Sequence, residues 1–214
     1  MLKKTLLLTT LLSTSIFAQF KYNIIEINAD TKARMIQGNS WRKSCPVPLT
    51  DLRYIQINHW DFNDKIITGE VIVHKDRAED FVEVFTALFK IHYPIRQMHL
   101  ISDYGGDDWK SIEADNTSVF NCRSVIGKKK RWSQHAYGKA IDINPIENPY
   151  ISKKGKISHK ASLKYKKRLH KVKSNPDKAI LLKEDNATKI FQQHGWKWGG
   201  DWHTIKDYQH FVKK

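Results

Sequence analysis

The residues best suited to chemistry lie in two short segments of the C-terminal half of the 214-residue chain. In SQHAYGKAIDINP, His135 and Asp142 stand seven positions apart across a glycine, and in the closing WGGDWHTIKDYQHF, Asp207 precedes His210 by three positions. Imidazole nitrogen and carboxylate oxygen bind zinc at about 2.0 to 2.2 Å, and a catalytic zinc takes three protein ligands and leaves one position for water. A further carboxylate can accept a proton as that water attacks a carbonyl. His135, Asp142 and His210 are therefore the candidate ligands, and Asp207 is the candidate base.

Local structure favours this convergence. The alternation over residues 140–144 predicts a strand that places Asp142 on the face opposite two buried isoleucines. A tight turn at Tyr137–Gly138 would fold His135 back over the same face. His210 lies on what we predict to be the last strand, within reach of the same point. Each signal is weak alone, because a single histidine is more often an ordinary core or surface residue.

The two segments together resemble the M15 zinc peptidases, the D-alanyl-D-alanine carboxypeptidases and L-alanyl-D-glutamate endopeptidases of bacteria and phages. SQHAYGKAIDINP is similar to their SxHxxGxAxD signature, and WGGDWHTIKDYQHF is similar to their closing WGGxW…DxxHF segment. The resemblance extends upstream through NTSVFNCR and covers most of the chain from Cys45 to Phe211. It implies an α+β fold, a small mixed or antiparallel sheet with flanking helices and a zinc cleft.

The resemblance also implies roles for individual residues. His135, Asp142 and His210 correspond to the ligands of one zinc ion per chain, and Asp207 corresponds to the general base, which is a glutamate in several relatives. Arg123 in NCR corresponds to an arginine that binds substrate or steadies the oxyanion, where a guanidinium is worth several kcal/mol in transition-state stabilisation. The alternative for Arg123 is an ordinary surface ion pair.

Four neighbours of these motifs are weaker candidates, for which packing is at least as good an explanation. Ser133 is expected to fix the motif loop or donate a hydrogen bond behind the ligands, Tyr137 to shape the substrate pocket, and Trp202 or His203 to line it. The other histidines have no ligand-like partner at useful spacing and are interpreted as bystanders.

Hydrophobic periodicity predicts the surrounding elements in outline. Residues 52–62 and 67–74 alternate like the two strands of a hairpin, and apolar residues at helical spacing follow over 78–89, with Asp76 and Glu79 at capping-box spacing. The remaining expectations are a third strand over 94–101, a long polar loop over 102–123, and a short helix over 186–194 between Asp185 and Gly195. Strands in hairpins without regular βαβ alternation indicate an α+β fold.

The N-terminal end predicts export. Residues 1–18 combine two lysines, an apolar run too short to span a bilayer and Ala18 at a cleavage point, which is typical of a signal peptide; an uncleaved anchor is the alternative. The rest divides into an N-terminal extension, 19–44, and a catalytic domain, 45–214, with a lysine-rich insertion at about 153–173. Cys45 and Cys122 are expected to form a disulfide in an oxidising compartment, the alternative being two buried free thiols.

A net charge of +15 calls for an anionic neighbour. For an exported protein the expected partners are peptidoglycan stem peptides and anionic cell-wall polymers, with no nucleic acid, although a charge run alone is more often a solvated face. The expected location is periplasmic or secreted, without a transmembrane segment after signal cleavage, and the expected state is a monomer.

Three function classes compete on this sequence. The first is a peptidoglycan peptidase that cuts a stem-peptide bond, either D-Ala-D-Ala or the L-Ala-D-Glu type. The second is a basic, non-catalytic wall-binding module on the same fold, which would need no carboxylate base such as Asp207. The third is a secreted nuclease, which would require a site richer in oxygen ligands for a hard cation.

Overall fold

Strands and helices follow one another without regular alternation, and the chain has the predicted α+β fold. The computed structural model describes residues 19–125, 127–169 and 174–214. The predicted signal peptide lies outside the described residues, as do the last four residues of the predicted insertion. No helix in the described ranges has the length and apolar character needed to cross a bilayer.

The elements of the described chain are short, apart from one hairpin and one helix. The strands are β1 (Tyr22–Glu26), β2 (Leu52–Trp60), β3 (Ile66–His74), β4 (Ser124–Val125), β5 (Lys128–Trp132), β6 (Ala140–Asp142), β7 (Tyr150–Ile151), β8 (Lys197–Trp198), β9 (Lys206–Asp207) and β10 (His210–Val212). The α-helices are α1 (Ala29–Gln37), α2 (Ala78–Lys90), α3 (Asp108–Glu113), α4 (Asn175–Lys178) and α5 (Asn186–Gln193). The 3₁₀ turns are η1 (Leu49–Asp51), η2 (Lys75–Arg77), η3 (Ile101–Tyr104), η4 (Gln134–Tyr137), η5 (Lys160–Tyr165) and η6 (Gly199–Asp201).

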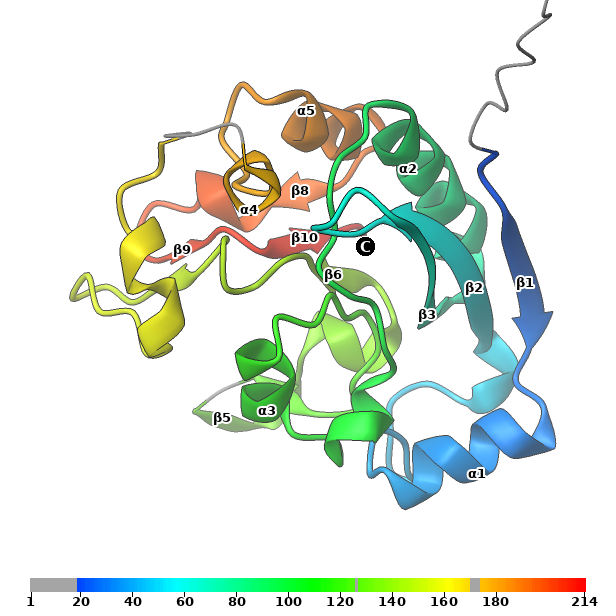
Figure 1. Cartoon of the computed structure of the whole chain (residues 1–214). Helices are drawn as coiled ribbons and strands as arrows, with labels where there is room; N and C mark the ends of the chain where they lie inside the picture. Colours follow the sequence, from blue (N-terminus) through cyan, green and yellow to red (C-terminus); the bar gives the residue numbers. More distant parts are fainter. Residues whose placement is uncertain (1–18, 126, 170–173) are drawn as a thin grey trace, which may run out of the picture.

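The largest sheet is the antiparallel set β1, β2 and β3, at one side of the molecule (Figure 1). The predicted hairpin is confirmed, because β2 pairs with β3 in continuous register from Leu52 opposite His74 to Trp60 opposite Ile66. Strand β1, which the sequence analysis did not predict, pairs with the other edge of β2. The division between residues 19–44 and the catalytic domain stays a prediction.

Helix α2 forms the apolar face that its periodicity predicts. Its buried residues include Phe81, Phe85 and Leu88, and the helix packs against β2 and α5 (Figure 1). The predicted capping box does not form, since η2 precedes the helix and the helix has no side-chain cap. The carboxylate of Asp76 instead lies 3.4 Å from the imidazole of His74.

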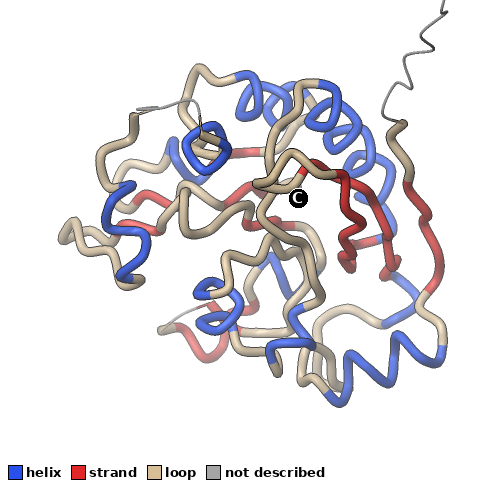
Figure 2. The backbone as a smooth tube through the Cα atoms, viewed as in Figure 1, coloured by secondary structure: helices blue, strands red, loops and turns tan. Residues whose placement is uncertain are grey.

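A second antiparallel sheet, in the order β6, β10, β8, crosses the middle of the molecule, as the tube of Figure 2 also shows. Its inner side joins the main core, where the ring of Phe211 stacks on Phe191 with centroids 3.9 Å apart and Ile141 is fully buried. Burial of these apolar side chains fixes which face of β6 and β10 remains for polar residues.

The prediction of a third strand over 94–101 is wrong. This extended segment makes isolated bridges at Pro94 and Met98, and its backbone N–H groups at Arg96 and His99 donate to the side chains of Asn144 and Asn116. Because side-chain amides take the place of a neighbouring strand, no ladder develops. The predicted long loop is also only partly correct, since it contains η3 and helix α3.

A disulfide joins Cys45 to Cys122, as predicted, with the two Cα atoms 5.7 Å apart. It connects the segment before β2 to the segment that carries Arg123, and it lies beside a small core that includes Met35 of α1. The bridge therefore anchors one wall of the candidate site to the hairpin half of the molecule.

Candidate functional site

His135 lies in η4, a single turn fixed by contacts at both of its ends. The hydroxyl of Ser133 accepts a hydrogen bond from the backbone N–H of His135 at 3.3 Å, which is the loop-fixing contact expected of Ser133. Gly138 ends the turn with φ of +65°, and a Cβ there would lie 2.6 Å from the backbone nitrogen of His74. Only glycine meets both requirements without strain, so the predicted turn depends on it.

Asp142 and His210 are brought together by strand register. β6 and β10 are antiparallel, and the two residues stand directly opposite each other. The Nδ1 atom of His210 lies 2.8 Å from Oδ1 of Asp142. Side chains opposite each other on one face of a pair have Cβ atoms about 5 Å apart, so the register alone places these ligand atoms together.

His135 completes the cluster from the other side. Its Nε2 atom lies 3.2 Å from Oδ2 of Asp142 and 3.3 Å from Nδ1 of His210. Its Nδ1 lies 2.6 Å from the carbonyl oxygen of Val119, so Nδ1–H donates there and the lone pair of Nε2 faces the cluster. The three side chains are buried, and their nearest nitrogen and oxygen atoms all lie within 4.8 Å of one another. This set of two imidazoles and one carboxylate fits a metal ion.

The charges of the cluster depend on one another. Burial alone would raise the pKa of Asp142, but the neighbouring imidazoles of His135 and His210 outweigh it and hold the pKa well below its usual range. Burial likewise disfavours the charged form of His210, yet the hydrogen bond to Asp142 raises the pKa of His210 above its ordinary value. Asp142 is therefore a carboxylate, as a metal ligand must be.

Asp207 lies on β9, beside the cluster and outside it. The carboxylate interacts electrostatically with Asp142, His210 and Arg123. Its buried Oδ1 atom has no hydrogen-bond partner among the described residues. Burial, followed by repulsion from Asp142, raises the pKa of Asp207 to about 6. Gly199 permits this placement, because a Cβ at Gly199 would lie 2.4 Å from the carbonyl oxygen of Asp207.

Arg123 lies on a second side of the site and is held by α3. Its Nη2 atom lies 2.6 Å from Oδ2 of Asp108, whose other oxygen accepts a hydrogen bond from Asn121 at 3.0 Å. Its Nε–H is buried without a partner among the described residues. The positive charge of Arg123 acts to lower the pKa of both Asp207 and His210. Arg123 thus forms an ion pair with Asp108, and its Nε–H donor is not used by any described residue.

The three ring-bearing candidates, Trp202, Tyr137 and His203, differ in burial and in their position relative to the cluster. The ring of Trp202 lies 5.5 Å from that of His210, at an angle of 56°, and is partly buried. Tyr137 is also partly buried and lies in the same turn as His135, whereas His203 is exposed. Among these three described side chains, the ring of Trp202 is the one that contacts the cluster, at His210.

Sequence reasoning missed several groups that support the site. The carbonyl oxygen of Val119 selects the tautomer of His135, and Asp108 orients Arg123. A backbone carbonyl carries no sequence signal. The acidic pair in GGDDW is a sequence signal for a partner of the arginine, but it lies in the segment that the sequence predicts to be loop.

The lysine-rich insertion is anchored close to the site by a half-buried arginine, Arg168. Arg168 donates hydrogen bonds to the carbonyl oxygen of Leu181 and to the side chain of Asn148, and its guanidinium lies 4.3 Å from the ring centroid of Tyr208. Tyr208 follows Asp207 directly. The insertion is therefore part of the framework of β9 as well as a carrier of exposed lysines.

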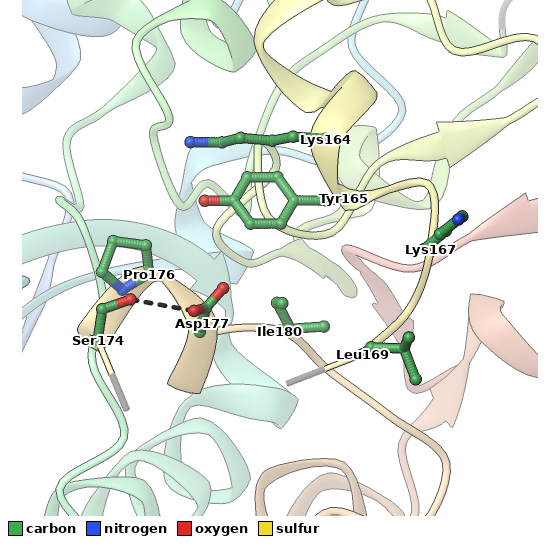
Figure 3. A pocket seen from close by; sticks show the side chains of 8 residues that line it. All are labelled: Lys164, Tyr165, Lys167, Leu169, Ser174, Pro176, Asp177 and Ile180. Atoms are coloured by element: carbon green, nitrogen blue, oxygen red, sulfur yellow. Dashed lines mark hydrogen bonds between the residues drawn. The ribbon is translucent and has the colours of Figure 1, made fainter. Parts of the chain in front are cut away.

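Two other features could be mistaken for the site. A hollow of about 280 Å³, with the ring of Tyr165 and the Ser174–Asp177 contact at its wall, shares no residue with the cluster (Figure 3). A second group of possible ligands, Glu70, His99 and Asp103, is more exposed, and Arg34 already pairs with both of its carboxylates. Neither feature has the buried, converging donors of the first cluster.

Comparison with known proteins adds one finding. Residues 127–213, which contain all three residues of the cluster and Asp207, match the model of the M15 peptidase family described as D-alanyl-D-alanine carboxypeptidase. No curated protein and no solved structure matches the chain.

Proposed function

We propose that the chain is a zinc-dependent peptidase of peptidoglycan stem peptides, because residues 127–213 match the model of the M15 peptidase family described as D-alanyl-D-alanine carboxypeptidase. The observation that carries the proposal is the convergence of His135, Asp142 and His210 inside the matched residues, with Asp207 beside them. The two possible bonds are D-Ala-D-Ala, cut by a carboxypeptidase, and the L-Ala-D-Glu type, cut by an endopeptidase.

His135, Asp142 and His210 would hold the zinc ion. When bound, zinc supplies a Lewis acid, which polarises a carbonyl and activates water. The remaining steps belong to the side chains of the chain itself. Asp207 accepts the proton of the attacking water and returns it to the leaving amine, a role that its pKa of about 6 suits at neutral pH. The Oδ1 atom of Asp207, which has no hydrogen-bond partner among the described residues, can accept that proton.

Arg123 is the group proposed to bind negative charge on the substrate. Its guanidinium, fixed by Asp108, is partly exposed and can donate to the substrate carboxylate or to the oxyanion that forms at the scissile carbonyl. Ser133 caps the turn that carries His135, and in this proposal Tyr137 shapes the substrate pocket and Trp202, next to His210, lines it. A fixed ion pair keeps the arginine in place before substrate arrives, which lowers the reorganisation cost of catalysis.

The proposed setting is the periplasm or the exterior of the cell. The disulfide between Cys45 and Cys122 supports an oxidising compartment. Exposed lysines of the insertion support contact with anionic wall polymers. A monomer and a single zinc ion per chain belong to the same proposal.

A second candidate is a wall-binding module without catalysis, which the exposed lysines of the insertion favour. They are Lys153, Lys154, Lys156, Lys160, Lys164, Lys166 and Lys167. Such a module would have no use for a raised carboxylate pKa beside a ligand cluster, so Asp207 argues for the enzyme.

The test is digestion of purified muropeptides followed by mass spectrometry, which identifies the bond. We expect hydrolysis that chelator abolishes and zinc restores, and loss of both zinc and activity in His210→Ala, because two ligands hold zinc poorly. His194→Ala, which removes a histidine outside the cluster, is the matched control and should keep both. Full activity in excess chelator would contradict the proposal, and binding to wall without hydrolysis by the zinc-loaded protein would favour the binding module.

A further inference from the structure

Trp109, the second residue of α3, presents its indole ring to solvent. Half of its surface is exposed, which places it among the few large apolar side chains left open on the described surface. A single exposed aromatic residue is common and proves nothing by itself. What sets Trp109 apart is how its ring is fixed and which residue precedes it.

His159 of the lysine-rich insertion backs the ring. The centroids of the two rings lie 3.8 Å apart with an interplanar angle of 32°. The imidazole is held in turn by Glu113, at the other end of α3, whose Oε1 lies 3.0 Å from Nδ1 of His159. The indole is thus held in one orientation by a contact from a distant part of the chain, so little conformational entropy is lost when a ligand stacks on it.

The same helix connects Trp109 to the candidate site. Asp108 is the adjacent residue, and its carboxylate holds Arg123 at 2.6 Å. Arg123 in turn acts electrostatically on Asp207 and His210. The exposed ring therefore belongs to the same short helix that holds Arg123.

We propose that Trp109 is a stacking platform for a pyranose ring of the glycan strand, so that the enzyme recognises a stem peptide still attached to its sugar. This inference rests on the proposed function and deepens it. A pyranose has one face made of C–H groups with a slight positive charge, and an indole has an apolar face of negative potential, so the two stack favourably. Stacking also removes the exposed indole from water.

The test compares two substrates that share one stem peptide, attached to the disaccharide in the first and released from it in the second. For Trp109→Ala we expect KM for the attached peptide to rise about tenfold, the change that corresponds to losing one good aromatic contact. The kcat on both substrates and KM for the released peptide should stay unchanged, and Trp109→Phe should keep most of the preference. Tyr22→Ala removes an equally exposed ring on β1, at the outer edge of the hairpin sheet, and is the matched control.

A binding experiment separates this inference from the proposed function. Peptide-free tetrasaccharides of N-acetylglucosamine and N-acetylmuramic acid are titrated into labelled protein, and the indole N–H signal absent from Trp109→Ala is followed by NMR. A shift of that signal supports the platform even if no peptide is hydrolysed. An unshifted signal overturns it. Equal losses by Trp109→Ala on both peptide substrates also overturn it, because they would mean that the residue acts only by supporting Asp108 and Arg123.

Discussion

Asp207→Asn is the substitution that separates catalysis from folding most clearly. Asparagine keeps the size of the side chain but cannot accept a proton from the attacking water. We therefore expect turnover of stem peptides to fall by roughly 10²-fold or more, the range typical of losing a positioned acid–base group. Zinc content should stay at one ion per chain, since Asp207 is not among the three proposed ligands.

The same substitution should stabilise the protein in chelator. Burial and the Asp142 carboxylate raise the pKa of Asp207 from 3.8 to about 6, so its charged form costs about 3 kcal/mol in the folded state. A raised carboxyl pKa means that the folded state keeps its proton longer than the unfolded state does. The parent therefore loses stability as pH rises from about 4 to about 6, and the full penalty persists above that range. The gain from Asp207→Asn should be absent at pH 4 and approach 3 kcal/mol at pH 7.

Urea unfolding at pH 4 and pH 7, with chelator and with zinc, measures the effect. Zinc should shrink the gain at pH 7, because a nearby cation offsets the charge of Asp207. Asp201→Asn, an exposed aspartate on η6, is the control and should change neither activity nor stability appreciably. A variant that hydrolyses substrate at the parent rate would show that Asp207 is not the base. Equal stability of Asp207→Asn and the parent at pH 7 in chelator would show that the carboxylate is not held at an electrostatic cost.

Two further predictions concern stability alone. Replacing Cys45 and Cys122 with serine together should lower the free energy of unfolding by about 2 to 5 kcal/mol, measured in denaturant, and the zinc content of the folded protein should not change; an unaltered midpoint would contradict the structural role of the bridge. Burial and the neighbouring Asp115 carboxyl raise the pKa of Glu147 to about 9, so the parent should lose stability as pH rises above about 4.5, and Glu147→Gln should be more stable than the parent at pH 8 but not at pH 4. A Glu147→Gln variant less stable than the parent at pH 8 would show that the charged carboxylate is favoured.

Features with a local sequence signal were predictable. The hairpin of β2 and β3 follows from alternation, and α2 follows from apolar residues at helical spacing, because both patterns report one buried face of a single element. The proximity of His135 and Asp142 was also predictable, since His135 lies in one turn and Asp142 ends the short strand that follows it. The capping box at Asp76 had the right spacing, yet the 3₁₀ turn η2 begins there and Asp76 interacts with His74.

The sequence by itself determined the residue types of the candidate ligands, the turn at Gly138 and the two isoleucines behind Asp142, because each depends on residues close in the chain. Only the tertiary structure decided the rest. The pairing of β6 with β10 sets His210 opposite Asp142 across 68 positions, and the carbonyl oxygen of Val119 selects the nitrogen that His135 presents. Asp108 pairs with Arg123, and Trp109 packs on His159; both come from α3, which the sequence pattern predicts to be loop. Such contacts join segments far apart in the chain, and their geometry depends on the packing of the whole core, which no local pattern encodes.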